Sequence, residues 1–417
     1  MIKVIAGGQR HGSVTVPSSK SQAHRALITA ALSDRPCRLY FTGASNDILA
    51  TAGCLGALGA NIALTEGGCI VRPISQSAPG EKLLRPGESG STLRFLLPLA
   101  GALGVSARFI LEGRLGKRPM DALTDELKAH GMSVQGDESS LICSGKLTSG
   151  VYTLPGDVSS QFVSGLLFAL PLLEGDSEIR LTGAIESRAY ITMTENALAK
   201  CSVRIKNDGR NYFIPGSQHY EAGDSMSVEG DWSNAAFFLC MGALSYEGVS
   251  VRGLDTVSAQ GDKAVLDILE RFGANININD DVVSVSKGAL RPQTIDASMI
   301  PDLVPALSAL CALASGRSEI TNAARLRLKE SDRLKTTSRM LNALGARVTE
   351  TVDGLIIDGV NRLKGGRADA AGDHRIAMAA ATAACGCEEN VEICGAECVN
   401  KSYPAFFNDF EALEVTV

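Results

Sequence analysis

The residues best suited to chemistry are cations and hydroxyls at the starts of expected helices. Lys20, Ser21 and Arg25 occur together in PSSKSQAHR, around the beginning of an apolar segment. A helix N-terminus presents unpaired N–H groups and about half a positive charge, so basic side chains there oppose the helix dipole unless an anion is bound. The pattern therefore favours an anion site, although Ser21 alone could be an ordinary helix cap.

Similar polar openings recur along the first half of the chain. The segment SSQ supplies Ser159, Ser160 and Gln161, whose hydroxyl and amide groups suit a phosphate but equally suit a plain cap. GESGSTLR is a flexible glycine turn that contains Gly90 before a helix, and KRPMDAL places Arg118 before another. Each opening is a weak signal by itself.

The second half contains three more charged segments. RLKESDRL includes Lys329, Glu330 and Arg333, and such runs are usually solvated helix starts with local ion pairs. Cations crowd its N-terminal side, which is unusual for that interpretation. GDHRIAM supplies Arg375, whose guanidinium is a better anion ligand than the neighbouring histidine, and Lys401 precedes the final expected helix.

One carboxylate and four cysteines allow two interpretations. Asp302 follows a proline at the opening of an apolar segment, where the helix dipole alone would explain it. The cysteines at 385, 387, 394 and 398 lie close together in sequence, but their spacing fits no standard zinc pattern. We expect buried small side chains there and no metal.

Bulk properties narrow the class of protein. A chain of 417 residues is too long for one ordinary core, so two domains or a repeat array are expected. The net charge of −6 argues against a nucleic-acid binder that relies on bulk charge. No apolar run reaches the roughly 18 residues of a membrane span, and no export signal is visible. With 11 scattered cysteines, we expect a cytoplasmic protein with reduced thiols.

The elements that must position these residues form an internal repeat. Six apolar helical segments begin at Ser19, Ser89, Ser159, Asp231, Pro301 and Asp373. Their starts differ by 70, 70, 72, 70 and 72 residues, which indicates repeated structural units. A shorter amphipathic helix follows each one, and most of these end in a glycine phrase such as GANIAL or GARVTE before alternating β-type residues.

Each unit therefore reads as βαβαββ. The opening strand MIKVIAG is left over at the N-terminus and is expected to complete the last unit. Helices that are apolar all round must be buried, so we predict an α/β (α+β) fold with helices inside and sheets outside. Six units divide into a continuous domain over 18–229 and a discontinuous domain made of 1–17 plus 230–417. Two crossings would form a hinge, and the polar helix starts would converge on the interdomain cleft.

Taken together, the motifs resemble one family along essentially the whole chain. They are PSSKSQAHR, GESGSTLR, RPMDAL, VSSQF, ESRAYI, EGDWS, QGD, IPD, LKESDRL, GDHR and NKSYP, in that order. This ordered set is similar to the 5-enolpyruvylshikimate-3-phosphate synthases, an enolpyruvyl transferase family. The resemblance implies a two-domain inside-out α/β barrel, with three units in each domain. It implies transfer of enolpyruvate from phosphoenolpyruvate to the 5-hydroxyl of shikimate 3-phosphate, with release of phosphate, in chorismate and aromatic amino acid biosynthesis. It also implies that no metal or organic cofactor is used. We further expect a monomer.

The resemblance assigns roles residue by residue. Asp302 and Glu330 match the acid–base carboxylates, and Lys20 matches an assisting catalytic group. The positions that match shikimate 3-phosphate ligands are Lys20, Ser21, Arg25, Ser159, Ser160, Gln161, Ser187, Asp302 and Lys329. The positions that match phosphoenolpyruvate ligands are Lys20, Gly90, Arg118, Gln161, Arg333, Arg375 and Lys401. Glu88 and Arg325 depart from an Asn found in some members, and the retained glycine suggests that the inhibitor glyphosate can enter.

Three alternatives stay in view. The enolpyruvyl transferase that acts on UDP-N-acetylglucosamine shares this chemistry, but it resembles KN at the first helix and usually has a cysteine near Arg118. This chain has KS at Lys20 and no cysteine in that loop. An RNA-phosphate cyclase should show a histidine near its C-terminus, whereas the last one here is His374. An inactive anion-binding relative would need no acid–base pair.

Overall fold

The computed structural model describes residues 1–75 and 80–416. The chain forms two compact units, Met1–Ser19 with Glu229–Val417, and Lys20–Val228. It passes from one unit to the other twice, between residues 19 and 20 and between residues 228 and 229. Among the described residues, no helix is both long enough and apolar enough to cross a membrane.

The unit Lys20–Val228 contains three four-stranded sheets. Their strand orders are β14 (Ser225–Ser227), β3 (Cys37–Tyr40), β5 (Gly68–Arg72), β4 (Asn61–Thr65); β6 (Lys82–Gly87), β7 (Ala107–Leu111), β9 (Ser140–Gly145), β8 (Met132–Gly136); and β10 (Val151–Pro155), β11 (Ser177–Thr182), β13 (Asn211–Ile214), β12 (Lys206–Asn207). In each sheet the first pair is parallel and the other pairs are antiparallel. This is the pairing expected of βαβ followed by a hairpin.

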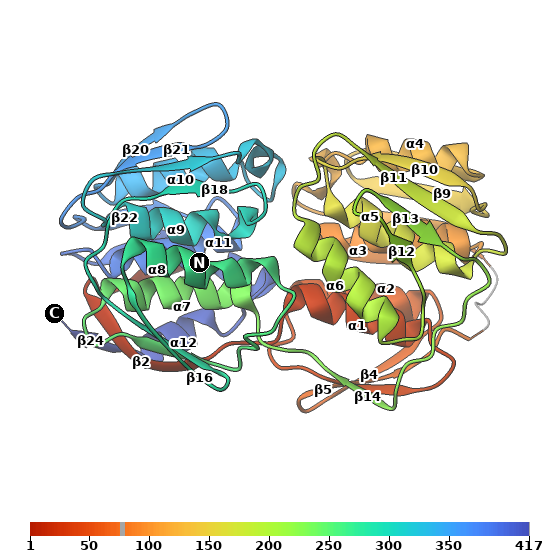
Figure 1. The fold of residues 1–417 in the computed structure, drawn as a ribbon, viewed down its shortest axis with the longest axis horizontal. Coiled ribbons are helices and arrows are strands. Elements are labelled where there is room, and N and C mark those ends of the chain that lie inside the picture. Colours follow the sequence, from red (N-terminus) through yellow and green to blue (C-terminus); the bar gives the residue numbers. More distant parts are fainter. Residues whose placement is uncertain (76–79, 417) are drawn as a thin grey trace. The chain divides into compact units, whose positions relative to one another are not determined.

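Two kinds of helix alternate in this unit (Figure 1). The apolar helices are α1 (Lys20–Ala31), α3 (Gly90–Ala102) and α5 (Ser160–Ala169), and nearly every residue of each is buried. The helices that bury one face are α2 (Asn46–Ala57), α4 (Asp121–Ala129) and α6 (Arg188–Ala199). Short 3-10 turns lie at η1 (Leu115–Lys117) and η2 (Leu170–Leu172). A helix without a polar face can only sit inside the unit, as the sequence predicted.

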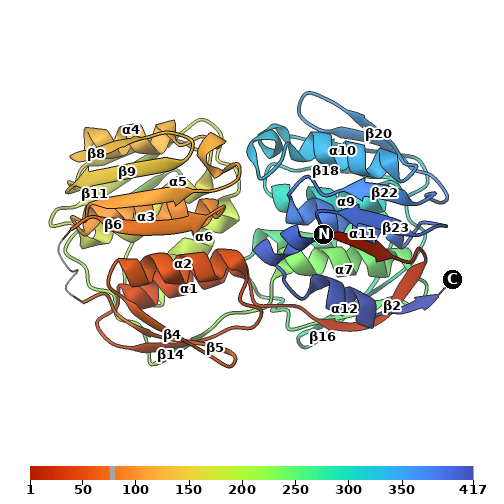
Figure 2. The ribbon, with the colours of Figure 1, turned by 180° about the vertical axis from the view of Figure 1, so that it is seen from behind.

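The other unit repeats this plan, seen from behind in Figure 2. Its sheets are β16 (Asn275–Asn279), β17 (Val282–Ser286), β15 (Val249–Arg252), β2 (Gln9–Thr15), β24 (Glu414–Thr416); β18 (Thr294–Asp296), β19 (Arg317–Thr321), β21 (Leu355–Asp358), β20 (Arg347–Glu350); and β1 (Ile2–Ile5), β23 (Val391–Cys394), β22 (Gly366–Asp369). The apolar helices are α7 (Trp232–Leu244), α9 (Val304–Cys311) and α11 (His374–Ala384). The remaining helical elements are α8 (Val265–Phe272), α10 (Arg333–Ala343), α12 (Phe406–Ala412), η3 (Gly261–Ala264), η4 (Pro301–Leu303), η5 (Ala324–Leu328) and η6 (Ala396–Lys401).

The N-terminal segment supplies two strands where the sequence predicted one. Strand β1 pairs antiparallel with β23, with Lys3 opposite Ile393, so it completes the last repeat as expected. Strand β2 pairs in parallel with β15, with Val14 opposite Val251, and so completes the fourth repeat. The short strand β14, which precedes α7, pairs instead with β3 of the first repeat. Each unit is therefore completed by the strand that comes just before the chain crosses to the other unit. This strand is β2 in the unit that contains Glu229–Val417, and β14 in the unit Lys20–Val228.

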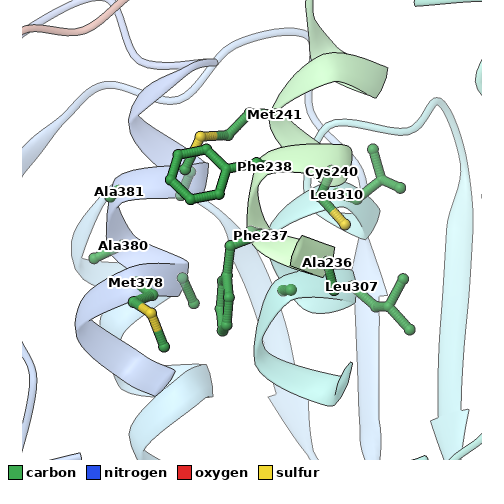
Figure 3. Packing of buried hydrophobic residues seen from close by; sticks show 14 of the residues in the cluster. Ala236, Phe237, Phe238, Cys240, Met241, Leu307, Leu310, Met378, Ala380 and Ala381 are labelled. Carbon is green, nitrogen blue, oxygen red and sulfur yellow. The ribbon is translucent and has the colours of Figure 1, made fainter. Parts of the chain in front are cut away.

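Aromatic and small side chains fill the space between α7, α9 and α11 (Figure 3). Phe237 and Phe238 of α7 lie against the Ala-rich face of α11, and both are fully buried. Small residues on α11 leave room for the large rings of α7. Burying each ring contributes about 1.5–3 kcal/mol, so this core anchors the N-terminal ends of the three helices.

The amphipathic helices end in a shared turn. Gly59, Gly131, Gly273 and Gly345 follow four of these helices with φ of 114°, 95°, 90° and 97°. Glycine tolerates this left-handed conformation without a Cβ penalty, which is why it is common after helix C-termini. The third repeat keeps the turn without the glycine, because Ser202 takes the same place with φ of 63°. The local fold therefore depends on the repeat rather than on glycine.

Candidate active site

A buried guanidinium organises three carboxylates in the unit that contains Glu229–Val417. Arg333 is the first residue of α10, and its side chain is only 1% exposed. Its Nη1 donates to Asp302 Oδ1, its Nη2 to Glu330 Oε2 and its Nε to Asp373 Oδ2, each at 2.8 Å. Such charge-assisted bonds are short and directional, so one side chain fixes the positions of two predicted acid–base groups.

Asp302 is held as a carboxylate by its neighbours. Arg375 Nη2 lies 3.2 Å from its Oδ2, and Arg375 Nη1 donates to its backbone oxygen at 3.1 Å. Burial alone raises the pKa of the Asp302 carboxyl, but the charges of Arg375, Lys329 and Arg333 hold it well below its usual range. An ionised, partly buried carboxylate at this place can accept a proton.

The helix starts explain why these groups meet. Asp302 lies in η4, which leads into α9, and Arg375 is the second residue of α11. Asp373 caps α11 by accepting from the Arg375 backbone N–H at 3.0 Å, while it also binds Arg333. Lys401 is buried at the end of η6, an element that packs against α11. Polar groups thus collect at the N-terminal ends of buried helices.

The unit Lys20–Val228 holds its cations differently. Arg25 of α1 is buried, and its Nε donates to Thr194 Oγ1 at 2.8 Å. Its two terminal nitrogens donate to the backbone oxygens of Ser21 and Tyr190, at 2.5 and 2.7 Å. The guanidinium also lies 5.2 Å from the ring centre of Phe95. Since all these partners are neutral, burial lowers the pKa of Arg25 to about 10, and its positive charge stays unneutralised by them.

Lys20 has an acidic partner. It is the first residue of α1, and its Nζ lies 2.8 Å from Asp47 Oδ2 in the first turn of α2. The pair is mostly buried, with side-chain exposures of 16% and 8%. An ion pair that is shielded from water keeps the ammonium in one position, which suits a group that must meet a substrate.

Gly90 and Arg118 lie in direct contact. A Cβ added to Gly90 would come within 2.7 Å of Arg118 Nη1 and 3.0 Å of its Cζ. Gly90 opens α3, and Ser89 caps that helix by accepting from the Thr92 N–H at 3.3 Å. The absence of a side chain therefore lets a guanidinium lie against a helix N-terminus, which is a favourable place for an anion.

Gln161 is fixed by a network between α3 and α5. Its Oε1 accepts from Arg94 Nη1 at 2.7 Å, and its Nε2 donates to Ser91 Oγ at 2.8 Å. Ser159 caps α5 by accepting from the Gln161 N–H at 3.3 Å. Arg94 also donates to the Pro119 carbonyl oxygen, next to the residue Arg118, at 3.1 Å. One buried arginine therefore orients two predicted ligand segments.

The remaining predicted ligands of this unit also lie at helix starts. Ser160 is buried as the first residue of α5, and Ser187 is buried just before α6. Ser187 has φ of 52° and ψ of 39°, a left-handed conformation that L-residues rarely adopt. Such strain is often found where a side chain must be presented to a ligand.

The comparisons with known proteins agree along the whole chain. The family model for EPSP synthase (3-phosphoshikimate 1-carboxyvinyltransferase) matches residues 5–410. A 3-phosphoshikimate 1-carboxyvinyltransferase from Clostridium kluyveri is 44% identical over 405 residues, which cover 96% of this chain and 95% of the relative. The chain belongs to the EPSP synthase family. A second such relative, from Clostridium botulinum, is 42% identical over 416 residues that cover 97% of this chain and 96% of the relative.

A solved EPSP synthase from Acinetobacter baumannii has the same fold. The TM-score is 0.80 at 26% sequence identity, and the match covers 100% of both chains. This confirms the predicted family and the predicted α/β fold of six repeated units. The activity of the EPSP synthase family, 3-phosphoshikimate 1-carboxyvinyl transfer in the shikimate pathway, is therefore the activity of this chain.

Sequence reasoning overlooked three acidic residues of this EPSP synthase chain. Asp47, Asp373 and Asp262 received no role, although GDHR and QGD were among the family motifs. Asp373 and Asp47 lie at helix starts, where a carboxylate is unremarkable because it caps the helix or complements the dipole. Only the three-dimensional contacts reveal that they also bind Arg333 and Lys20.

The two positions that depart from the family pattern, Glu88 and Arg325, each have an identifiable neighbour in the structure. A Cβ on Gly113 would overlap the Glu88 carboxylate, so the glycine and this glutamate fit one another. Arg325 donates to the Ser298 carbonyl oxygen at 2.6 Å. Among residues 1–75 and 80–416, no group of three or more His, Cys, Asp or Glu could hold a metal. The expectation of buried side chains is confirmed for Cys385 and Cys387 but is wrong for Cys394 and Cys398, which are partly exposed.

Proposed function

We propose that the polar residues described in the two units bind the two substrates of one reaction and carry out its proton transfers. The unit Lys20–Val228 would hold shikimate 3-phosphate through Lys20, Ser21, Arg25, Ser159, Ser160, Gln161 and Ser187. The other unit would add Asp302 and Lys329 for this substrate, and Arg333, Arg375 and Lys401 for phosphoenolpyruvate, which also meets Lys20, Gly90, Arg118 and Gln161. The observation that carries the proposal is that Arg333 binds both Asp302 and Glu330 at 2.8 Å.

The chemistry needs an acid and a base together. Phosphoenolpyruvate is a poor electrophile until its methylene carbon gains a proton, which Glu330 would supply. The 5-hydroxyl of shikimate 3-phosphate then attacks the cation-like C2 while Asp302 takes its proton. The adduct loses phosphate, and a carboxylate recovers one proton from the new methyl group. Lys20 would assist proton transfer or phosphate departure.

The charge state of Asp302 supports its role as the base. The low pKa of its carboxyl keeps Asp302 ionised at neutral pH, which is the form that can accept a proton, and the same low pKa makes it a weak base. The arginines around it also suit the carboxylate and phosphate of phosphoenolpyruvate, because a guanidinium binds such groups through two parallel bonds.

The experiment is an assay of phosphate release with both substrates, followed by identification of the enol ether product. We expect Asp302→Asn and Glu330→Gln each to lower kcat by about 10²–10⁴-fold. The exposed carboxylates Asp267 and Glu389 give matched controls as Asp267→Asn and Glu389→Gln, which should stay within twofold of the parent chain. Phosphate release with UDP-N-acetylglucosamine, or binding without turnover, would refute the assignment.

A further inference from the structure

Two buried threonines occupy the same place in two repeats of the unit Lys20–Val228. Thr51 lies in α2, eight residues before the turn residue Gly59, and Thr194 lies in α6, eight residues before Ser202. Both side chains are fully buried, and the mechanism above uses neither. A buried hydroxyl is costly unless it forms hydrogen bonds, and both of these do.

Thr194 connects α1 with α5. The Nε–H group of Arg25 donates to Thr194 Oγ1 at 2.8 Å, and Thr194 Oγ1 lies 2.8 Å from Ser164 Oγ and 3.1 Å from the Tyr190 carbonyl oxygen. Because a hydroxyl has a single hydrogen, the bond accepted from Arg25 directs that hydrogen toward Ser164 or Tyr190. Ser164 lies one turn after Ser160, the first residue of α5. Thr194 therefore fixes Arg25 relative to the start of α5.

Thr51 connects α1 with α3. Its Oγ1 lies 2.7 Å from His24 Nδ1 and 2.6 Å from Thr92 Oγ1. Thr92 Oγ1 donates in turn to the Oγ of Ser89, the cap of α3, at 2.8 Å. The chain of hydrogen bonds thus runs from α1 through α2 to the residue that precedes Gly90.

The two threonines hold adjacent residues of one helix, because His24 and Arg25 are neighbours in the second turn of α1. In the other unit, the corresponding residue of α10 is Thr337, eight residues before Gly345. Thr337 is just as buried, but its hydroxyl has no hydrogen-bond partner among the residues that the structure describes. The links from α1 to α3 and α5 therefore do not follow from the repeat itself.

We propose that Thr51 and Thr194 are positioning residues, which fix the proposed substrate ligands at the starts of α1, α3 and α5. Because both side chains are fully buried, they act through the residues they bind and not through contact with a substrate. Thr194 holds the Arg25 guanidinium, so it serves mainly the binding of shikimate 3-phosphate. The inference rests on the proposed function, since Arg25 is there a ligand of that substrate.

Thr51 serves mainly the binding of phosphoenolpyruvate. It lies one turn after Asp47, the partner of Lys20. Its chain of hydrogen bonds ends at the cap that precedes Gly90. Lys20 and Gly90 are both proposed phosphoenolpyruvate ligands, and a small displacement of either would misplace the substrate. Loss of the Thr51 hydroxyl should therefore change KM for phosphoenolpyruvate more than it changes the binding of shikimate 3-phosphate.

The experiment compares valine substitutions, which keep the branched shape and remove the hydroxyl. Calorimetry measures the dissociation constant of shikimate 3-phosphate, and phosphate release measures KM for phosphoenolpyruvate. Thr194→Val should raise the dissociation constant about tenfold and KM less than about threefold. Thr51→Val should raise KM about 3–10-fold and leave the dissociation constant within about twofold. Thr337→Val is the matched control, and it should leave both constants within about twofold of the parent chain.

Serine substitutions separate positioning from packing. Thr51→Ser and Thr194→Ser keep the hydroxyl and lose a buried methyl group, so they should lower the urea midpoint but keep both constants within about twofold of the parent chain. Serine variants that bind as weakly as the valine variants overturn the inference. It is also overturned if the valine variants bind both substrates like the parent chain, or no more weakly than Thr337→Val. A parent chain that binds neither substrate would instead refute the proposed function.

Discussion

The two units share one plan but give their buried arginines different partners, neutral oxygens around Arg25 and carboxylates around Arg333. In the unit Lys20–Val228, the described partners of Arg25 are a hydroxyl and backbone carbonyl oxygens. In the other unit, Arg333 contacts Asp302, Glu330 and Asp373. Neutral partners leave a positive charge available to an anion, whereas carboxylate partners create a set of proton acceptors and donors.

This difference shows how one repeated scaffold acquires two roles. Within each unit, polar residues lie at the N-terminal ends of the buried helices, where the helix dipole favours anion binding. The repeat fixes where the polar residues lie, and the residue types decide what they do. On the proposed function, the unit Lys20–Val228 binds a phosphate, and the other unit also moves protons.

The largest expected effect comes from removing Arg333. Arg333→Met leaves one buried and two partly buried carboxylates without their common partner, which should cost about 3–5 kcal/mol of stability and abolish measurable transfer. Arg317 is the control, because its Nε lies at the same 2.8 Å from Asp358 but its side chain is 61% exposed. Arg317→Met should cost less than about 1 kcal/mol. Equal urea midpoints for the two variants would contradict the contrast.

Removing Arg25 should affect binding more than folding. Arg25→Met leaves neutral oxygens rather than charges unpaired, so the expected loss is about 1–3 kcal/mol of stability. Loss of charge-assisted bonds to a phosphate should weaken shikimate 3-phosphate binding by about tenfold or more. Fluorescence or calorimetric titration measures the binding constant, with the exposed Arg72→Met as the control. A fall in stability as large as that of Arg333→Met would show that the two arginines do not differ in kind.

The substitution Gly90→Ala tests the proposed anion site of the unit Lys20–Val228 through a smaller change. The added methyl group of Gly90→Ala would displace the Arg118 guanidinium, which is the movable end of a flexible side chain. Stability should change by less than about 1 kcal/mol. KM for phosphoenolpyruvate and the inhibition constant of glyphosate should each rise by about tenfold. Steady-state kinetics checks both values. Unchanged kinetics would mean that Arg118 does not act through this contact.

The smallest effect concerns the repeat itself. Ser202→Gly places the residue found in the other repeats at a position with φ of 63°, so it should add about 0.5–1 kcal/mol of stability. Kinetic constants should not move, because the turn lies at the opposite end of α6 from Ser187. Ser202→Ala serves as the control and should not stabilise the chain. Thermal unfolding of the three chains distinguishes these outcomes.

The sequence predicted the repeat well because one physical requirement recurs in it. An all-apolar helix must be buried, and six of them at a nearly constant spacing define the units. The pairing of β2 with β15 and of β14 with β3 was not predictable, since partners such as Val14 and Val251, or Ser225 and Arg38, lie too far apart in the sequence to leave a local pattern. Asp47 and Asp373 were missed for a related reason: each contacts a charged side chain that lies 27 or 40 residues away in the sequence.

The most direct test of the division between the two units compares Arg25→Met with Arg375→Met. Equilibrium binding of shikimate 3-phosphate and KM for phosphoenolpyruvate would be measured for both variants. The account predicts that Arg25→Met mainly weakens shikimate 3-phosphate binding, whereas Arg375→Met leaves it within about threefold and raises KM for phosphoenolpyruvate at least tenfold. Equal weakening of both substrates by both variants would contradict it.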